Sequence, residues 1–131
     1  MPTSFDRKDP AIRVLMLPKD TNALGKIFGG VILSYIDLAA AAEARKTAIA
    51  RYVTKAMKEV EFVHPVSLGD IVSFYTRTER VGRTSVTVNV VVEVEHNTDR
   101  EDRFRIVTEA QVVLVAVDEK GDPTPIHPRP A

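Results

Sequence analysis

The stretch that decides the fold is FGGVILSYIDLAAAAEARK, residues 28–46. Two glycines stand near its start, an almost unbroken apolar run follows, and Arg45 and Lys46 come near its end. Alanine and leucine favour helix, and cations near the end of a helix offset its dipole. The stretch therefore predicts one long helix over about residues 30–48, whose first half is apolar all round and buried on most sides.

Asp37 lies in the middle of this apolar run. A buried carboxylate is costly unless another group pairs with it or a reaction uses it. The usual explanation for an isolated acid in a helix is that it reaches solvent or caps a backbone group. Here the flanking residues are apolar, and no Lys or Arg lies within one helical turn on either side. We therefore interpret Asp37 as a candidate general base.

The residues before the helix offer hydrogen-bond donors at its positive end. Gly29 and Gly30 leave free backbone N–H groups there, which can bind a phosphate or stabilise a developing oxyanion. A tight turn that needs glycine is the alternative explanation. Asn22 lies in the preceding loop, where an Asn most often bonds its own backbone. The spacing of two helical turns from Gly30 to Asp37 places a donor and a base near the same end of one helix.

The rest of the chain reads as strands. In residues 84–95, valines recur at every second position and so occupy one face of a strand. Consecutive strands joined by short turns predict an antiparallel sheet that wraps around the single helix, an α+β fold. One helix cannot cover both faces of a sheet, so we expect part of its surface or an edge to be buried in an oligomer. The other predicted strands span residues 12–17, 52–63, 71–81 and 104–117.

The composition limits the possible functions. The 131 residues suit a single domain over residues 1–131, with an irregular Pro-rich tail over about 119–131. Lys plus Arg and Asp plus Glu both number 18, which argues against a general nucleic-acid binder. The absence of Cys excludes thiol catalysis, disulfides and Cys-based zinc sites. The N-terminus lacks the apolar core of a secretory signal, and the apolar run is too short to span a membrane, so we expect a cytoplasmic protein.

The remaining polar candidates are three histidines and a basic cluster. His64, His96 and His127 show no metal-ligand spacing, so we expect a surface or loop role for each and no metal site. The basic residues within 77–83 lie at a predicted strand end and turn, where they could hold phosphates. A solvated strand edge is the alternative explanation for them.

Two motifs occur in order along the chain. The first is N-x-x-G-x-x-x-G-G-x-x-[LM]-x-x-x-D and the second is F-x-x-P-V-x-x-G-D. Together with GRTSVTVNVVVEV and TEAQVVLVAVD, they resemble the hot-dog-fold acyl-CoA thioesterases, specifically the YciA-type bacterial acyl-CoA hydrolases. The resemblance runs over about residues 14–118. The positions that carry the two motifs are Asn22, Gly25, Gly29, Gly30, Leu33, Asp37, Phe62, Pro65, Val66, Gly69 and Asp70.

The resemblance implies an antiparallel sheet wrapped around one long helix, a homodimer with a continuous sheet, and a hexamer built as a trimer of dimers. It implies hydrolysis of acyl-CoA to a free acid and CoA at a site on the dimer interface. Asp37 would act as general base or nucleophile, with Asn22 of the partner subunit placing water or substrate. The backbone N–H of Gly30 would polarise the thioester carbonyl. No cofactor is implied, because CoA is part of the substrate and the product.

Further correspondences concern the binding of CoA. The turn GRTS implies CoA contacts for Arg83, Thr84 and Ser85, and the start of the helix implies substrate contacts for Phe28 and Gly29. Some relatives carry His where this chain has Phe28, so no histidine is expected to assist here. The chemistry would then rest on the aspartate and the asparagine alone.

Two alternatives stay open beside hydrolysis. A hot-dog dehydratase or hydratase would need a catalytic His paired with an acid, and no His lies near the helix in the sequence. A non-catalytic protein that binds or senses acyl-CoA is compatible with the fold. Such a sensor would be expected to lack the acid at position 37 and to need a second domain for its output.

Overall fold

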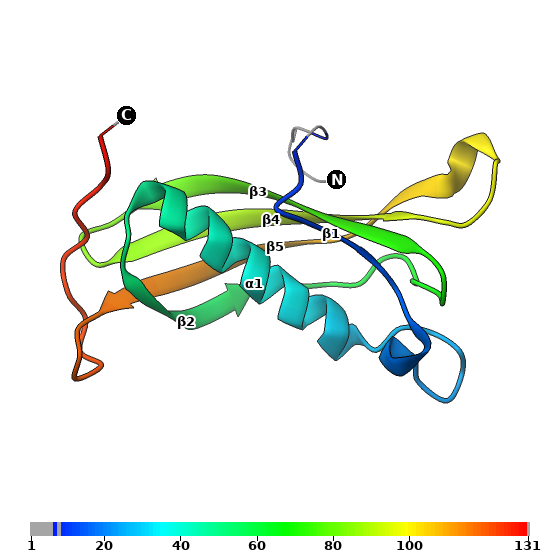
Figure 1. Cartoon of the computed structure of the whole chain (residues 1–131), viewed down its shortest axis with the longest axis horizontal. Helices are drawn as coiled ribbons and strands as arrows, with labels where there is room; N and C mark the ends of the chain where they lie inside the picture. The colour runs from blue at the N-terminus through cyan, green and yellow to red at the C-terminus, as the bar shows by residue number, and fades with distance from the viewer. Residues whose placement is uncertain (1–6, 8, 131) are drawn as a thin grey trace.

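The computed structural model describes residues 7 and 9–130. One long helix lies across one face of a five-stranded antiparallel sheet, which confirms the predicted α+β architecture (Figure 1). The elements in chain order are β1 (Ile12–Leu15), the 3-10 helix η1 (Pro18–Asp20), α1 (Gly29–Thr47), β2 (Arg51–Lys58), β3 (Ile71–Val81), β4 (Ser85–Glu95), the 3-10 helix η2 (Glu101–Arg103) and β5 (Phe104–Val117).

The strands follow the spatial order β1-β3-β4-β5-β2. β3, β4 and β5 pair with their sequence neighbours, with Tyr75 opposite Val91 and Asn89 opposite Gln111. β1 forms one edge of the sheet, and β2 forms the other by pairing with β5 alone. The prediction that each strand pairs with the next is therefore wrong for β2 and β3, because the connection between them crosses to the other side of the sheet.

This connection, residues 59–70, also ends β2 earlier than predicted. β2 stops at Lys58 rather than near residue 63, and the next residue, Glu59, takes a positive φ of 61°. The connection then passes the start of α1, where the Val66 carbonyl accepts a hydrogen bond from the Ile27 N–H. It therefore positions the loop before the helix, while a hydrogen bond from the Val63 N–H to the Val107 carbonyl at 2.9 Å still joins it to β5.

The core lies between α1 and the inner face of the sheet. The alternating valines of β4 point toward the helix and are fully buried, as their period predicts. The helix contributes small side chains at its centre, which allow the strands to approach it closely. Its buried residues are Ile32, Ile36, Ala39, Ala40 and Ala44.

One side of α1 stays uncovered within the chain. Leu38 is 57% exposed, and Val53 on the edge strand β2 is 48% exposed. Within residues 29–37, the first half of the helix, Gly30 and Ser34 are exposed and the other residues are buried or half-buried, so the predicted burial on most sides holds there. We name the region formed by Asp37, Leu38, Val53 and Thr54 the α1–β2 face. Because it adjoins the free edge of β2, a second chain placed there would cover both an open strand and exposed apolar side chains.

The C-terminal segment of the chain contacts the C-terminal end of α1. Residues 118–130 run beside the last turn of α1 and the β3–β4 turn (Figure 1). The Ile126 N–H donates to the Arg83 carbonyl at 2.8 Å, and the Arg129 N–H donates to the Thr47 carbonyl at 2.7 Å. The β3–β4 turn is thereby held near the C-terminal end of α1, far from its glycine-rich start.

Candidate functional site

Asp37 lies on the α1–β2 face, half-buried, two turns into the helix. Its Oδ1 accepts a short hydrogen bond from the hydroxyl of Thr54 on β2. Within the described part of the chain it forms no salt bridge, which agrees with the absence of nearby cations in the sequence. The strand pairing of β2 shifts register between Thr54 and Ala56, and such irregularities often re-aim side chains beside active sites. The carboxylate is therefore oriented by one hydroxyl and left without a counter-ion.

The two glycines at the start of α1 have different local reasons to be glycine. A Cβ on Gly29 would lie 3.4 Å from the Phe62 ring, so this glycine lets the ring rest against the helix. A Cβ on Gly30 would meet nothing within 4 Å, and Gly30 does not have a positive φ. Nothing in the described chain therefore requires glycine at position 30. Its N–H belongs to the first turn, which has no acceptor within the helix, and it stays open to a ligand or to a second chain.

Asn22 does bond its own loop, which is the ordinary role of an Asn in a turn. Its Oδ1 accepts from the N–H of Leu24 at 2.9 Å and from the N–H of Lys26 at 3.1 Å. Among the described residues the side-chain amide nitrogen forms no hydrogen bond, and Asn22 is half-buried. The oxygen thus fixes the loop while the NH₂ group remains available as a donor.

Asp20 also stabilises the loop that precedes α1. Its Oδ2 accepts from the Leu17 N–H at 2.9 Å, and its backbone carbonyl accepts from the N–H of Phe28 at 3.0 Å. The hydrogen bond from Leu17 lowers the pKa of Asp20 from its usual value; burial opposes this shift and Lys19 adds to it. Phe28 itself is 51% exposed at the helix N-cap, so its ring is free to contact a ligand.

The residues predicted to contact CoA lie at the other end of the molecule. Arg83 and Thr84 belong to the β3–β4 turn and Ser85 begins β4, beside the C-terminal end of α1. The 19 residues of α1 span about 28 Å at 1.5 Å per residue, so this turn and Gly30 are separated by most of the molecule. The structure therefore does not bring the two groups of predicted residues together within one chain.

A cluster of two histidines and an aspartate was missed by sequence reasoning. His64 Nε2 lies 2.7 Å from His96 Nε2, and His96 Nδ1 lies 2.9 Å from Asp70 Oδ2. Asp70 is only 3% exposed and also accepts from the Ser67 N–H at 2.8 Å. Both histidines lie in loops, as expected, but the contact between them was not predicted. The contact between Asp70 and His96 could have been found from the predicted hairpin of β3 and β4. Pairing Ile71 with Glu95 places the flanking residues 70 and 96 together.

His64 also lines a cavity beside the start of α1, which we name the helix-start cavity. Its volume is about 210 Å³, and Gly29 forms part of its wall. The statement that no histidine lies near the helix therefore holds for the sequence but not for the fold. Six apolar residues complete the lining: Ile27, Ile32, Phe62, Pro65, Val66 and Val107.

We expect the stability of the protein to decrease as the pH falls below about 6.5, the ordinary pKa of histidine. Burial lowers the pKa of His64, His96 and Arg105 lower it further by their charge, and Asp70 opposes them. The unfolded chain therefore takes up a proton at a pH where folded His64 does not, and this stability is lost between about pH 6.5 and the lower folded pKa.

Urea unfolding at about pH 8 and about pH 5.5 measures the effect. His64→Gln should reduce the loss of unfolding free energy between these conditions. His127→Gln, at an exposed position in the tail, serves as the matched control and should retain the wild-type loss. Identical pH dependence of His64→Gln and wild type would contradict the assignment.

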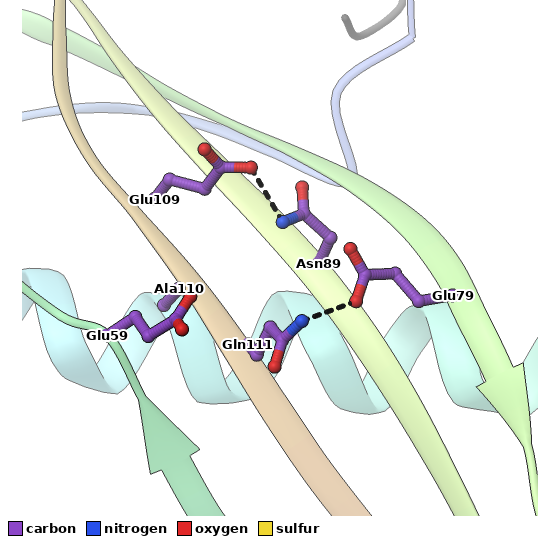
Figure 2. A pocket seen from close by; sticks show the side chains of 6 residues that line it. All are labelled: Glu59, Glu79, Asn89, Glu109, Ala110 and Gln111. Carbon is purple, nitrogen blue, oxygen red and sulfur yellow. Dashed lines mark hydrogen bonds between the residues drawn. The ribbon is translucent and has the colours of Figure 1, made fainter. Parts of the chain in front are cut away.

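A second hollow lies on the opposite face of the sheet from α1 (Figure 2). It has a volume of about 230 Å³ and contains three carboxylates, those of Glu59, Glu79 and Glu109. Asn89 Nδ2 donates to Glu109 at 2.7 Å, and Gln111 Nε2 donates to Glu79 at 2.7 Å. These bonds stabilise polar side chains on the outer face of the sheet, and none of the predicted site residues lies there.

Among residues 7 and 9–130, no three or more His, Cys, Asp and Glu side chains are grouped so that they could hold a metal ion. Likewise, no helix in this range has the length and apolar character needed to cross a membrane.

The sequence is similar to a known protein family and to several of its members. Residues 24–100 match the family model of the Thioesterase superfamily. The chain is 41% identical over 118 residues to an uncharacterized acyl-CoA thioester hydrolase of Buchnera aphidicola, covering 89% of this chain and 87% of that protein. It is 39% identical over 117 residues to the acyl-CoA thioester hydrolase YciA of Escherichia coli, covering 88% of each.

A solved structure supports the same relationship at the level of the fold. The hexameric hotdog fold thioesterase of Campylobacter jejuni superimposes with a TM-score of 0.85 at 41% identity. The match covers 93% of this chain and 92% of that one. With the sheet and central helix described above, these similarities confirm the predicted hot-dog fold. The chain belongs to the Thioesterase superfamily, among the YciA-type acyl-CoA thioester hydrolases.

Proposed function

We propose that this protein hydrolyses the thioester bond of acyl-CoA to a free carboxylic acid and CoA. The observation that carries the proposal is Asp37, a carboxylate without a counter-ion that Thr54 orients on an uncovered face of the helix. A general base needs an accessible carboxylate in a defined orientation, and both conditions are met. Relatives at about 40% identity that bear the name acyl-CoA thioester hydrolase support the substrate class.

The helix geometry favours a site built from two chains. Gly30 and Asp37 are seven residues apart, which is about 10.5 Å along the axis and nearly the same face of the helix. For a thioester carbonyl bonded to the Gly30 N–H at about 3 Å, this separation favours a carboxylate supplied by a second chain. Two antiparallel α1 helices related by a twofold axis near Ser34 would place Gly30 of one chain opposite Asp37 of the other. Ser34 is exposed, so this part of the helix is accessible to a second chain.

In the proposed reaction the Gly30 N–H stabilises the negative charge that develops on the carbonyl oxygen. Asp37 takes a proton from water, whose oxygen attacks the carbonyl carbon, and the carbon–sulfur bond breaks. The proton passes to the CoA thiolate, and the acid product releases its own proton to solvent. Alternatively, the Asp37 oxygen attacks first and water hydrolyses the resulting anhydride. In both routes Asn22 of the partner subunit positions water or substrate through its NH₂ group.

The proposed assembly is a homodimer through the α1–β2 face, arranged as a trimer of dimers. The Campylobacter jejuni neighbour is described as hexameric, which supports this choice. A two-chain site would also place the start of one helix nearer to the β3–β4 turn of its partner, where Arg83, Thr84 and Ser85 would contact CoA. We further propose that the reaction needs no cofactor, since CoA is part of the substrate and the product. We also propose that it takes place in the cytoplasm, with which the cysteine-free composition is compatible.

Release of free thiol from a panel of short, medium and long acyl-CoAs tests the proposal. We expect a saturated acyl-CoA to yield CoA thiol and acid in equal amounts. The same assay separates the alternatives, because a dehydratase or hydratase releases no thiol and a sensor binds acyl-CoA without turnover. The presence of His64 beside the helix removes the sequence argument against a dehydratase, so this distinction is needed. Absence of thiol release from every acyl-CoA would contradict the proposed hydrolysis.

A further inference from the structure

The helix-start cavity joins the proposed reaction centre to the histidine cluster. Gly29 forms part of its wall, and the next residue, Gly30, carries the N–H proposed to hold the thioester carbonyl. A thioester bonded there would lie beside the wall of the cavity. Every other side chain in the wall is apolar, so His64 is the single titratable group that an arm entering the cavity would meet.

The hydrogen bonds of His96 and Asp70 determine which nitrogen of the His64 ring is a donor and which is an acceptor. Asp70 is a buried acceptor, since it also takes the Ser67 N–H, so His96 Nδ1 carries a hydrogen and donates to it. When both rings are neutral, His96 Nε2 must then be an acceptor, and His64 Nε2–H donates to it across 2.7 Å. This leaves Nδ1 of His64 as a bare acceptor.

Nδ1 of His64 is also accessible. No described residue bonds to it, and no side-chain nitrogen or oxygen in the described chain is both sealed from solvent and without a partner. Because His64 lines the cavity, an accessible acceptor on its ring favours a ligand that brings a hydrogen-bond donor.

We propose that His64 Nδ1 accepts a hydrogen bond from a donor group of the bound acyl-CoA, either a hydroxyl on the acyl chain or an amide N–H of the pantetheine arm. Asp70 and His96 act as positioning residues, because they set the tautomer and orientation of the His64 ring. The inference rests on the proposed function, since it assigns a specificity contact within that same substrate.

The test compares kcat and KM for butyryl-CoA and β-hydroxybutyryl-CoA at about pH 8, above the ordinary pKa of histidine. His64→Phe keeps a ring but removes both nitrogens, whereas His64→Gln retains a donor toward His96 and an acceptor toward the cavity. His127→Phe in the exposed tail is the matched control. We expect His64→Phe to lower kcat/KM about three- to tenfold through KM, and His64→Gln to restore most of the loss.

The two sources of the donor give different patterns. Loss confined to the hydroxylated substrate assigns the acyl hydroxyl, and equal loss on both substrates assigns the pantetheine amide. Wild-type kinetics of His64→Phe, or a loss that His64→Gln does not restore, would overturn the proposal. If neither substrate releases thiol with the wild-type enzyme, the proposed hydrolysis has failed instead.

A measurement on the unmodified protein covers the case in which His64→Phe does not fold. Protonated Nδ1 cannot accept a hydrogen bond, so the substrate that uses it loses its advantage at low pH. Because burial lowers the pKa of folded His64, the lower pH is chosen below the value at which NMR titration shows the ring to protonate. If the acyl hydroxyl is the donor, the ratio of kcat/KM for the two substrates should shift against β-hydroxybutyryl-CoA between about pH 8 and that lower pH. If the amide is the donor, KM for both should rise together. Unchanged KM values and an unchanged ratio overturn the proposal without any variant.

Discussion

Asp37→Asn should lower kcat for acyl-CoA hydrolysis by about 10²- to 10⁴-fold, the usual loss for removing a general base. Asparagine keeps the volume of the side chain and an Oδ1 that can still accept from Thr54, so the geometry of the α1–β2 face is preserved. Only the charge and the basicity disappear. The free energy of unfolding should hold or rise, because a carboxylate without a counter-ion is replaced by a neutral amide.

The matched control is Asp118→Asn, which removes one charge from an exposed turn after β5. It should leave kcat and KM at wild-type values. Steady-state kinetics and urea unfolding of both variants provide the comparison. An Asp37→Asn protein that is folded, assembled and fully active would exclude both the general-base and the nucleophile mechanisms.

The helix and the long strands could be predicted because their signals are local. The valine alternation of β4 and the apolar run of α1 depend only on residues that are neighbours in sequence, and both elements form within one or two residues of the predicted bounds. The placement of β2 could not be predicted in the same way. Its pairing with β5 depends on where the 59–70 connection leads, and that path is fixed by contacts with the loop before α1.

In the candidate site, too, features with a local sequence signal could be predicted, and features that depend on tertiary contacts could not. Asp37 could be singled out because an isolated acid in an apolar run is visible in the sequence alone. The half-exposed state of its side chain could not be predicted from the sequence. It depends on how far the α1–β2 face is covered, and therefore on which strand forms the edge of the sheet. His64 and His96 are 32 residues apart, and their contact needs both a hairpin register and a loop path. Only the first of these could be predicted, so the cluster was missed.

Mixing Asp37→Asn with an Asn22 variant should restore activity that neither protein has alone, if each site draws Asp37 and Asn22 from different chains. Asn22→Asp is the sharper choice than alanine. Its carboxylate still accepts from the Leu24 and Lys26 N–H groups that shape the loop, while the NH₂ donor is lost. The reduced activity of this variant then reports on the donor and not on a disordered loop.

The expected recovery follows from symmetry. If subunits exchange freely, half of the dimers are hybrids, and each hybrid holds one site with both groups intact and one with neither. The mixture should therefore reach about a quarter of wild-type turnover, whether or not the dimers assemble further into hexamers. A tag on one of the two variants verifies that subunits exchange. A mixture of Asp37→Asn with Asp118→Asn serves as the control and gives the turnover expected when one parent is fully active. Verified exchange without recovery above the mean of the two parents would mean that Asp37 and Asn22 of each site come from the same chain, and the proposed role of Asn22 across the interface would be wrong.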